Sequence, residues 1–118
     1  IGNEERGEAL SLIGDVAERT ALIVDDEIVT GGTMFAAVDL LLERGAREVY
    51  ATCTHGVFSD GATERLGNNG LKELLITDTL PVSDGKKHEK ITVLSVAPIL
   101  GEAIHRIHSG LSVGAMFQ

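Results

Sequence analysis

The chain of 118 residues, 43% of them apolar, is long enough for one small domain, or part of one, with a modest core. Ten basic against eighteen acidic residues give a formal net charge of −8, which excludes nonspecific nucleic-acid binding because such binding needs a basic face. No apolar run approaches the length of a membrane span, so we expect no membrane partner, and the single cysteine, Cys53, cannot form an internal disulfide, so we expect a cytoplasmic location.

The first elements predicted along the chain are a strand, a helix and a second strand. Residues 21–25 are typical of a buried strand that ends in acidic residues, and residues 13–16 lead into it as a short strand or a turn. Apolar residues recur at helical spacing over 33–44, and Gly45 can end this helix. A second strand is predicted over 48–53.

The second half of the chain continues this alternation. The predicted elements are a helix, a strand, a polar loop, a strand and a helix, over residues 60–66, 73–77, 81–90, 91–94 and 97–108. Gly-Asn-Asn-Gly at 67–70 closes the first of these helices and is the strongest turn signal in the chain. Strands that alternate with helices imply right-handed crossovers and a parallel sheet, so the predicted fold class is α/β.

The turn between the first strand and the first helix carries the strongest functional signal. It reads Thr30-Gly31-Gly32-Thr33, and two adjacent glycines let the backbone approach an anion without a Cβ in the way. The following helix directs its free amides and its positive dipole end to the same place. A Walker loop and a dinucleotide fingerprint are excluded by spacing, and a plain structural turn is the alternative. The pattern predicts a site for a phosphorylated sugar.

Two carboxylates, Asp25 and Asp26, stand beside this turn at the carboxyl end of the strand, where open α/β sheets bind ligands. Adjacent like charges repel each other unless a ligand or a cation compensates them. We therefore predict that they accept hydrogen bonds from ribose hydroxyls or hold Mg²⁺ through water. An exposed acidic turn without a ligand is the alternative.

The pattern Asp-Asp-x-x-x-Thr-Gly-Gly-Thr resembles the phosphoribosyl-pyrophosphate loop shared by type I phosphoribosyltransferases and ribose-phosphate pyrophosphokinases. Three further stretches are similar to the pyrophosphokinases: Thr-His-Gly-Val-Phe-Ser at 54–59, Ile-Thr-Asp-Thr-Leu-Pro at 76–81 and the run 95–113. The likeness extends from about Ile13 to Phe117. By this resemblance the chain is the C-terminal part of a ribose-phosphate pyrophosphokinase.

The resemblance implies a three-layer α/β/α fold of the type I phosphoribosyltransferase kind, with a mainly parallel sheet. Residues 1–118 would form the ribose 5-phosphate-binding half of such a domain, starting inside the flexible catalytic loop and without the N-terminal domain. The implied reaction moves diphosphate from ATP, with Mg²⁺, to O1 of ribose 5-phosphate and gives phosphoribosyl pyrophosphate and AMP. The catalytic residues would lie upstream of Ile1, and the family rule is a homo-oligomer built on dimers.

The same resemblance assigns roles to residues of this chain. Asp25 and Asp26 would hold the ribose hydroxyls with Mg²⁺ nearby, and the turn at 30–33 would bind the 5-phosphate. Ser112 matches a serine that helps to bind a regulatory phosphate, but Gly114 replaces the second serine of that pattern. The lost hydroxyl would remove a hydrogen bond of about 1–3 kcal/mol, which argues against phosphate activation and ADP inhibition.

The other side chains that could take part in chemistry are expected to have structural roles. His55 and Ser59 flank the end of the second strand, where packing or hydrogen bonding is the commoner role of a histidine. Cys53 is expected in the core, and the basic run 86–88 is expected to be a solvated loop tip, with a nucleotide or subunit contact as the weaker alternative. For the whole chain, a type I phosphoribosyltransferase and a non-catalytic synthetase-associated subunit stay open as alternatives.

Overall fold

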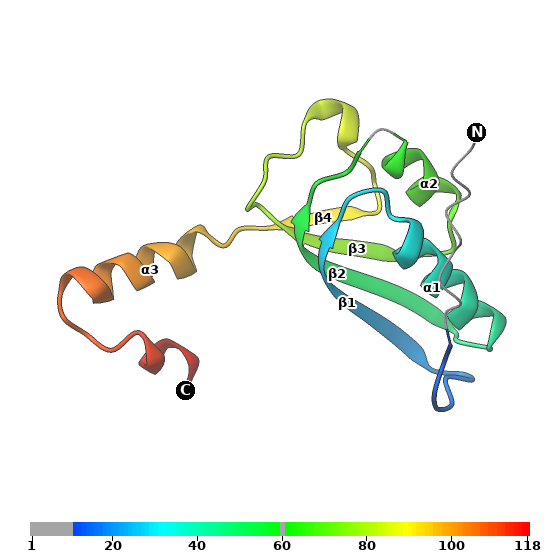
Figure 1. The fold of residues 1–118 in the computed structure, drawn as a ribbon, viewed down its shortest axis with the longest axis horizontal. Helices are drawn as coiled ribbons and strands as arrows, with labels where there is room; N and C mark the ends of the chain where they lie inside the picture. The colour runs from blue at the N-terminus through cyan, green and yellow to red at the C-terminus, as the bar shows by residue number, and fades with distance from the viewer. Residues whose placement is uncertain (1–10, 60) are drawn as a thin grey trace, which may run out of the picture.

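The computed structural model describes residues 11–59 and 61–118, which form a four-stranded sheet with helices (Figure 1). Neighbouring strands are all parallel, and their order in the sheet is β1-β2-β3-β4. The strands are β1 Thr20–Ile28, β2 Glu48–Gly56, β3 Glu73–Thr77 and β4 Ile91–Leu94. The α-helices are α1 Gly32–Glu43, α2 Ala62–Asn68 and α3 Ala97–His108, and short 3₁₀ turns lie at η1 Asp84–Lys86 and η2 Gly114–Phe117.

The predicted bounds are confirmed for β3, β4 and α3, but β1 and β2 are longer than predicted. Both strands continue because Glu27 pairs with His55 and Ile28 with Gly56. The prediction that the first strand ends at Asp25 and Asp26 is therefore wrong: both carboxylates lie within β1. The predicted start of the second helix at residue 60 lies outside the described residues.

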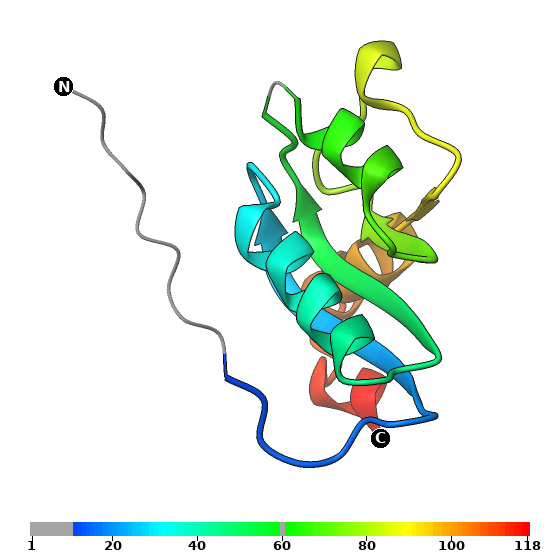
Figure 2. The same ribbon diagram turned by 90° about the vertical axis from the view of Figure 1, so that its right-hand side faces the viewer.

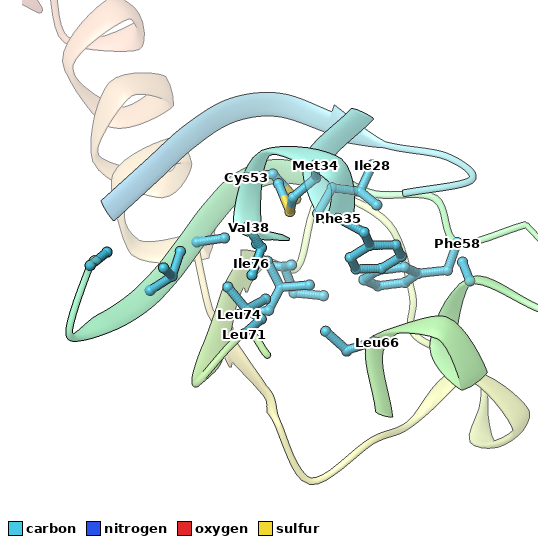
Figure 3. Packing of buried hydrophobic residues seen from close by; sticks show 14 residues of the cluster. Ile28, Met34, Phe35, Val38, Cys53, Phe58, Leu66, Leu71, Leu74 and Ile76 are labelled. Atoms are coloured by element: carbon cyan, nitrogen blue, oxygen red, sulfur yellow. The ribbon is translucent and has the colours of Figure 1, made fainter. Parts of the chain in front are cut away.

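The hydrophobic core lies between one face of the sheet and the helices α1 and α2. Because strand order follows chain order, right-handed crossovers place every connection on the same face, and α1 and α2 both lie there (Figure 2). The buried side chains include those of Val38, Val49, Phe58, Leu66, Leu71, Leu74 and Ile76, several of them labelled in Figure 3. This core fixes the start of α1 beside the end of β1.

The opposite face of the sheet is uncovered in the described residues. Leu22 and Val24 of β1 are 60% and 73% exposed. The α3 helix extends away from the sheet instead of packing on it (Figure 1), and none of its residues is buried. The α/β class with a parallel sheet is confirmed, but the second helical layer of the expected three is not formed by α3, because this helix continues outward from the end of β4.

Asp78 ties the start of α3 to the sheet. Its Oδ1 accepts a hydrogen bond of 2.8 Å from the Val96 amide, and the Asp78 amide donates to the Leu94 carbonyl at 3.1 Å. The Ser95 hydroxyl and then the Val96 amide, both bonded to the Asp78 carboxylate, hold the pKa of Asp78 below its ordinary value of 3.8. The charged carboxylate thus anchors Val96, the residue before α3, to the end of the neighbouring strand.

Replacing Asp78 with Asn is expected to loosen α3, because an amide oxygen accepts hydrogen bonds less strongly than a carboxylate. Amide hydrogen exchange over the first turn of α3 would become faster at neutral pH. Since the folded-state pKa is lowered, the contribution of Asp78 is present above its ordinary pKa of 3.8 and is lost as the pH falls below it. Asp84→Asn, the control, removes the same charge from η1; equal protection of α3 in both variants would contradict the anchoring role of Asp78.

Candidate functional site

A shallow hollow of about 180 Å³ lies between the end of β1 and the start of α1. Its lining consists of Asp25 and the continuous stretch 27–34. All four residues of the Thr-Gly-Gly-Thr turn, residues 30–33, therefore line one hollow, at the carboxyl end of the strand where the sequence predicts a ligand.

The backbone of this turn requires glycine at its second position. Gly31 is the N-cap of α1 with φ 75°, in the left-handed region that side chains rarely adopt. A Cβ at Gly31 would also overlap the ring of Phe35. The turn thus rests directly on the Phe35 ring, which is itself buried in the core.

The first turn of α1 leaves amides for a ligand. Among residues 11–59 and 61–118, the amides of Gly31, Thr33 and Met34 have no protein acceptor, and only the Gly32 amide is used locally, at 3.3 Å from Thr30 Oγ1. First-turn amides have no partner within their own helix, and they carry the positive end of its dipole. The hollow can therefore bind an anion through backbone donors.

The carboxylates of β1 divide between its two sides. Asp25 and Glu27 line the hollow, whereas Asp26 between them belongs to the opposite side because side chains alternate along a strand. The sequence reading missed Glu27; strand alternation would have found it had β1 been extended to Ile28. The predicted roles of Asp25 and Asp26 toward ribose and Mg²⁺ stay predictions.

The segment after β2 holds the start of the turn in place. The amides of Val57 and Phe58 donate to the Ile28 carbonyl at 3.0 and 3.1 Å. Ser59 donates twice to the Val29 carbonyl, from its amide at 2.8 Å and from its hydroxyl at 3.2 Å. Ser59 therefore supports the site through the backbone of the residue before Thr30.

His55 is hydrogen-bonded to the end of β3. Its Nδ1 lies 2.8 Å from the Thr79 hydroxyl, and that hydroxyl donates to the Thr54 carbonyl at 3.2 Å. This agrees with the hydrogen-bonding role predicted as the commoner one for this histidine.

Arg65 of α2 is a second residue that the sequence reading missed. Its Nη1 donates to the Thr30 carbonyl at 3.4 Å, and its guanidinium carbon lies 5.5 Å from the centroid of the Phe35 ring. The two contacts join residues about thirty positions apart, so no local sequence signal could have indicated them.

Cys53 is a buried core residue, as predicted. It is 2% exposed, and its pKa is raised to about 11, first by burial and then by the charges of Asp25 and Asp26. A thiol that stays protonated at neutral pH is no nucleophile. Cys53 therefore takes no chemical role in the site.

We expect iodoacetamide to label Cys53 of the folded chain far more slowly than that of the urea-unfolded chain at about pH 8, because the thiolate is the reactive form. The raised pKa favours the neutral thiol in the folded state, so the free energy of unfolding falls as the pH rises from 9.0 through about 11. Cys53→Ala is expected to remove this pH dependence. Equally fast labelling of folded and unfolded chain would contradict the burial.

The other residues singled out by sequence lie apart from the hollow. Lys86 Nζ donates to the Val57 carbonyl at 3.0 Å. Lys86 therefore has a structural contact, whereas the sequence predicts a solvated loop tip here. Lys87 and His88 line a separate hollow of about 250 Å³ beneath the loop between β3 and β4. Ser112 lies between α3 and η2, in the C-terminal segment that extends away from the sheet (Figure 1). Its regulatory role stays a prediction.

Metal and membrane sites can be assessed from the described part of the chain. It contains no group of three or more His, Cys, Asp or Glu side chains placed to hold a metal ion. It also contains no helix with the length and apolar character needed to cross a bilayer. The carboxylates of Asp25 and Glu27, which both line the hollow, still suit Mg²⁺, which keeps several waters and is bound by only one or two carboxylates plus phosphate.

The fold and the hollow together define the class of protein: a parallel α/β domain with its candidate ligand site at the first strand-to-helix turn. A family model described as "Phosphoribosyl synthetase-associated domain" matches residues 3–118. The chain belongs to this family, which confirms the resemblance found in the sequence.

Curated relatives and a solved structure agree with this assignment. The chain is 50% identical over 110 residues to a ribose-phosphate pyrophosphokinase of Oceanobacillus iheyensis, covering 93% of this chain and 35% of the relative. It is 50% identical over 111 residues to the chloroplastic ribose-phosphate pyrophosphokinase 2 of Spinacia oleracea, covering 94% and 28%. The crystal structure of phosphoribosylpyrophosphate synthetase from Mycobacterium smegmatis matches with a TM-score of 0.81 and 44% identity over 83% of this chain and 33% of that one. The chain thus spans about a third of the length of these proteins.

Proposed function

We propose that this chain provides the ribose 5-phosphate site of a ribose-phosphate pyrophosphokinase. The full reaction would move diphosphate from ATP to O1 of ribose 5-phosphate and release AMP, as a step in nucleotide biosynthesis. One observation carries the proposal: the Thr-Gly-Gly-Thr turn lines a hollow and presents, at a helix N-terminus, amides that have no acceptor among the residues that the structure describes. A sugar phosphate needs such converging donors at one end.

Each part of the hollow would take one part of the substrate. The amides of Gly31 and Thr33, with the hydroxyls of Thr30 and Thr33, would bind the 5-phosphate. Asp25, whose carboxylate lines the hollow, would accept hydrogen bonds from the ribose hydroxyls, and Asp26, on the other side of β1, would have the smaller part. The sugar would then be held at both ends, so that its O1 faces the nucleotide.

Mg²⁺ fits the acidic side of the hollow. Asp25 and Glu27, which both line the hollow, would hold it through water, and Asp26 on the other side of β1 would add negative charge nearby. When bound, the metal supplies charge neutralisation for the transferring diphosphate. The chain itself contributes the orientation of the sugar.

The chain alone is proposed to bind ribose 5-phosphate weakly and to catalyse no turnover. It spans about a third of the length of its relatives. Positioning ATP and neutralising the charge of the transferred diphosphate require further groups, which we expect upstream of Ile1. A coupled assay of AMP release with ATP, Mg²⁺ and ribose 5-phosphate tests this. Binding without turnover is the expected result, and substantial turnover by these 118 residues would contradict it.

A non-catalytic synthetase-associated subunit is the second candidate, and the description of the matching family favours it. Such a subunit would keep the fold and regulate a catalytic partner. A longer protein containing this chain would then release no AMP by itself but would change the rate of AMP release by a catalytic synthetase. A type I phosphoribosyltransferase would instead consume phosphoribosyl pyrophosphate and need no ATP.

A homo-oligomer built on dimers is proposed, in a cytoplasmic setting. The support comes from apolar side chains that the described chain leaves exposed, such as Ile104 and Ile107 of α3, at 67% and 69%. An amphipathic helix with its apolar stripe in water is typical of an interaction surface.

A further inference from the structure

Arg65 sits against the Thr-Gly-Gly-Thr turn from the side of α2. Its guanidinium contacts the turn at the Thr30 carbonyl, at 3.4 Å from Nη1. Its Nη2 lies 3.9 Å from the position that a Cβ at Gly32 would occupy. Arg65 therefore borders both halves of the turn, although it comes from another helix.

Phe35 links Arg65 to the other glycine of the turn. The Phe35 ring fills the space that a Cβ at Gly31 would need, and the guanidinium carbon lies 5.5 Å from the centroid of that ring. A guanidinium over an aromatic face is attracted by the ring's quadrupole. The ring and the guanidinium, which stack on each other, thus both contact the turn: Gly31 lies on the ring, and the Thr30 carbonyl accepts a hydrogen bond from the arginine.

The charge around the hollow gives this arginine a second effect. Asp25 and Glu27 line the hollow, and the whole chain carries a formal charge of −8. Both oppose the binding of a phosphate dianion. In residues 11–59 and 61–118, Arg65 is the one lysine or arginine that donates a hydrogen bond to the turn. Its positive charge is therefore the one that these contacts place to offset the negative charge at the hollow.

We propose that Arg65 is a positioning residue of the phosphate site: it holds the Thr-Gly-Gly-Thr turn in its binding conformation and offsets the negative charge of a phosphate bound there. The assignment rests on the proposed function of this turn. The shape of guanidinium matters as well as its charge, because it donates to Thr30 and stacks on Phe35 at once, which an ammonium group does less well.

The test is a titration of the ¹⁵N-labelled 118-residue chain with ribose 5-phosphate, followed through the amide signals of residues 31–33. Arg65→Gln is expected to weaken binding about tenfold, and Arg65→Lys to fall between it and the unsubstituted chain. Arg47→Gln is the matched control, because it removes the same charge from a residue that lies just before β2, where Arg47 donates to the Thr20 hydroxyl. It is expected to leave the affinity unchanged.

A ³¹P titration of the bound phosphate separates the electrostatic effect of Arg65 from its effect on the conformation of the turn. Arg65 favours the dianion, so the second pKa of bound ribose 5-phosphate is expected to rise in Arg65→Gln and to rise less in Arg65→Lys. If Arg65→Gln and the unsubstituted chain had the same affinity and the same phosphate pKa, the role of Arg65 would be overturned while the proposed phosphate site would stand. The same would follow if Arg47→Gln weakened binding as much as Arg65→Gln. Absence of signal changes at residues 31–33 in the unsubstituted chain would overturn the proposed phosphate site, and this assignment with it.

Discussion

Replacing Gly31 with alanine is expected to abolish phosphate binding and to lower the free energy of unfolding by about 2–4 kcal/mol. Two causes add: the left-handed backbone at φ 75° disfavours any side chain, and the new Cβ would overlap the Phe35 ring. The turn can relieve the overlap only by moving away from the ring, which displaces the amides that would bind phosphate. Urea denaturation and a phosphate titration measure the two effects.

Gly61→Ala provides a closely matched control. Gly61 is the N-cap of α2 as Gly31 is of α1, and its φ is 82°, but a Cβ there would meet no atom of residues 11–59 and 61–118 within 4 Å. Only the backbone penalty remains, so we expect a loss of about 1–2 kcal/mol and unchanged phosphate binding. If Gly31→Ala lost no more stability than Gly61→Ala and still bound phosphate, the close packing of the turn on Phe35 would be contradicted.

Replacing Asp25 with Asn is expected to raise the dissociation constant for ribose 5-phosphate by about 10–100-fold. A carboxylate accepts two hydroxyl hydrogen bonds more strongly than an amide, and Asp25 lines the hollow beside the turn. Inorganic phosphate has no ribose, so its affinity is expected to stay the same or to increase slightly as a nearby negative charge is removed. Isothermal titration with both ligands separates the two effects.

Two companion variants refine this prediction. Asp26→Asn is expected to have a smaller effect than Asp25→Asn, because Asp26 belongs to the other side of β1. Asp15→Asn removes the same charge from the segment before β1 and is expected to leave both affinities unchanged. Equal losses of affinity for ribose 5-phosphate and inorganic phosphate in Asp25→Asn would contradict a role of this carboxylate toward the sugar.

The fold could be predicted well where local sequence signals mark both ends of a helix or strand. The bounds of β3 and β4 follow from short apolar runs between turn residues, and those of α3 from its apolar spacing. The ends of β1 and β2 could not be predicted, because residues such as Glu27 and His55 have low strand preference and extend the sheet only by pairing with each other.

The part of the site whose residues are adjacent in the sequence could be predicted. The turn at 30–33 is recognisable because its amides, glycines and hydroxyls are adjacent in sequence, and the structure places them in one hollow. Arg65 contacts the turn, and Ser59 contacts Val29 just before it, from other parts of the chain, so only the tertiary fold shows these contacts. The amphipathic spacing of α3 indicates that its apolar side needs a partner, but it does not identify that partner, and in the described chain this side is exposed.

The most direct test of the proposed site is the position of ribose 5-phosphate in crystals of the chain soaked with it. We expect phosphate oxygens at about 2.7–3.1 Å from the amide nitrogens of residues 31–33, with the ribose hydroxyls directed to Asp25. A sugar phosphate bound instead in the hollow beside Lys87 and His88, with the Thr-Gly-Gly-Thr turn left free of ligand, would contradict it.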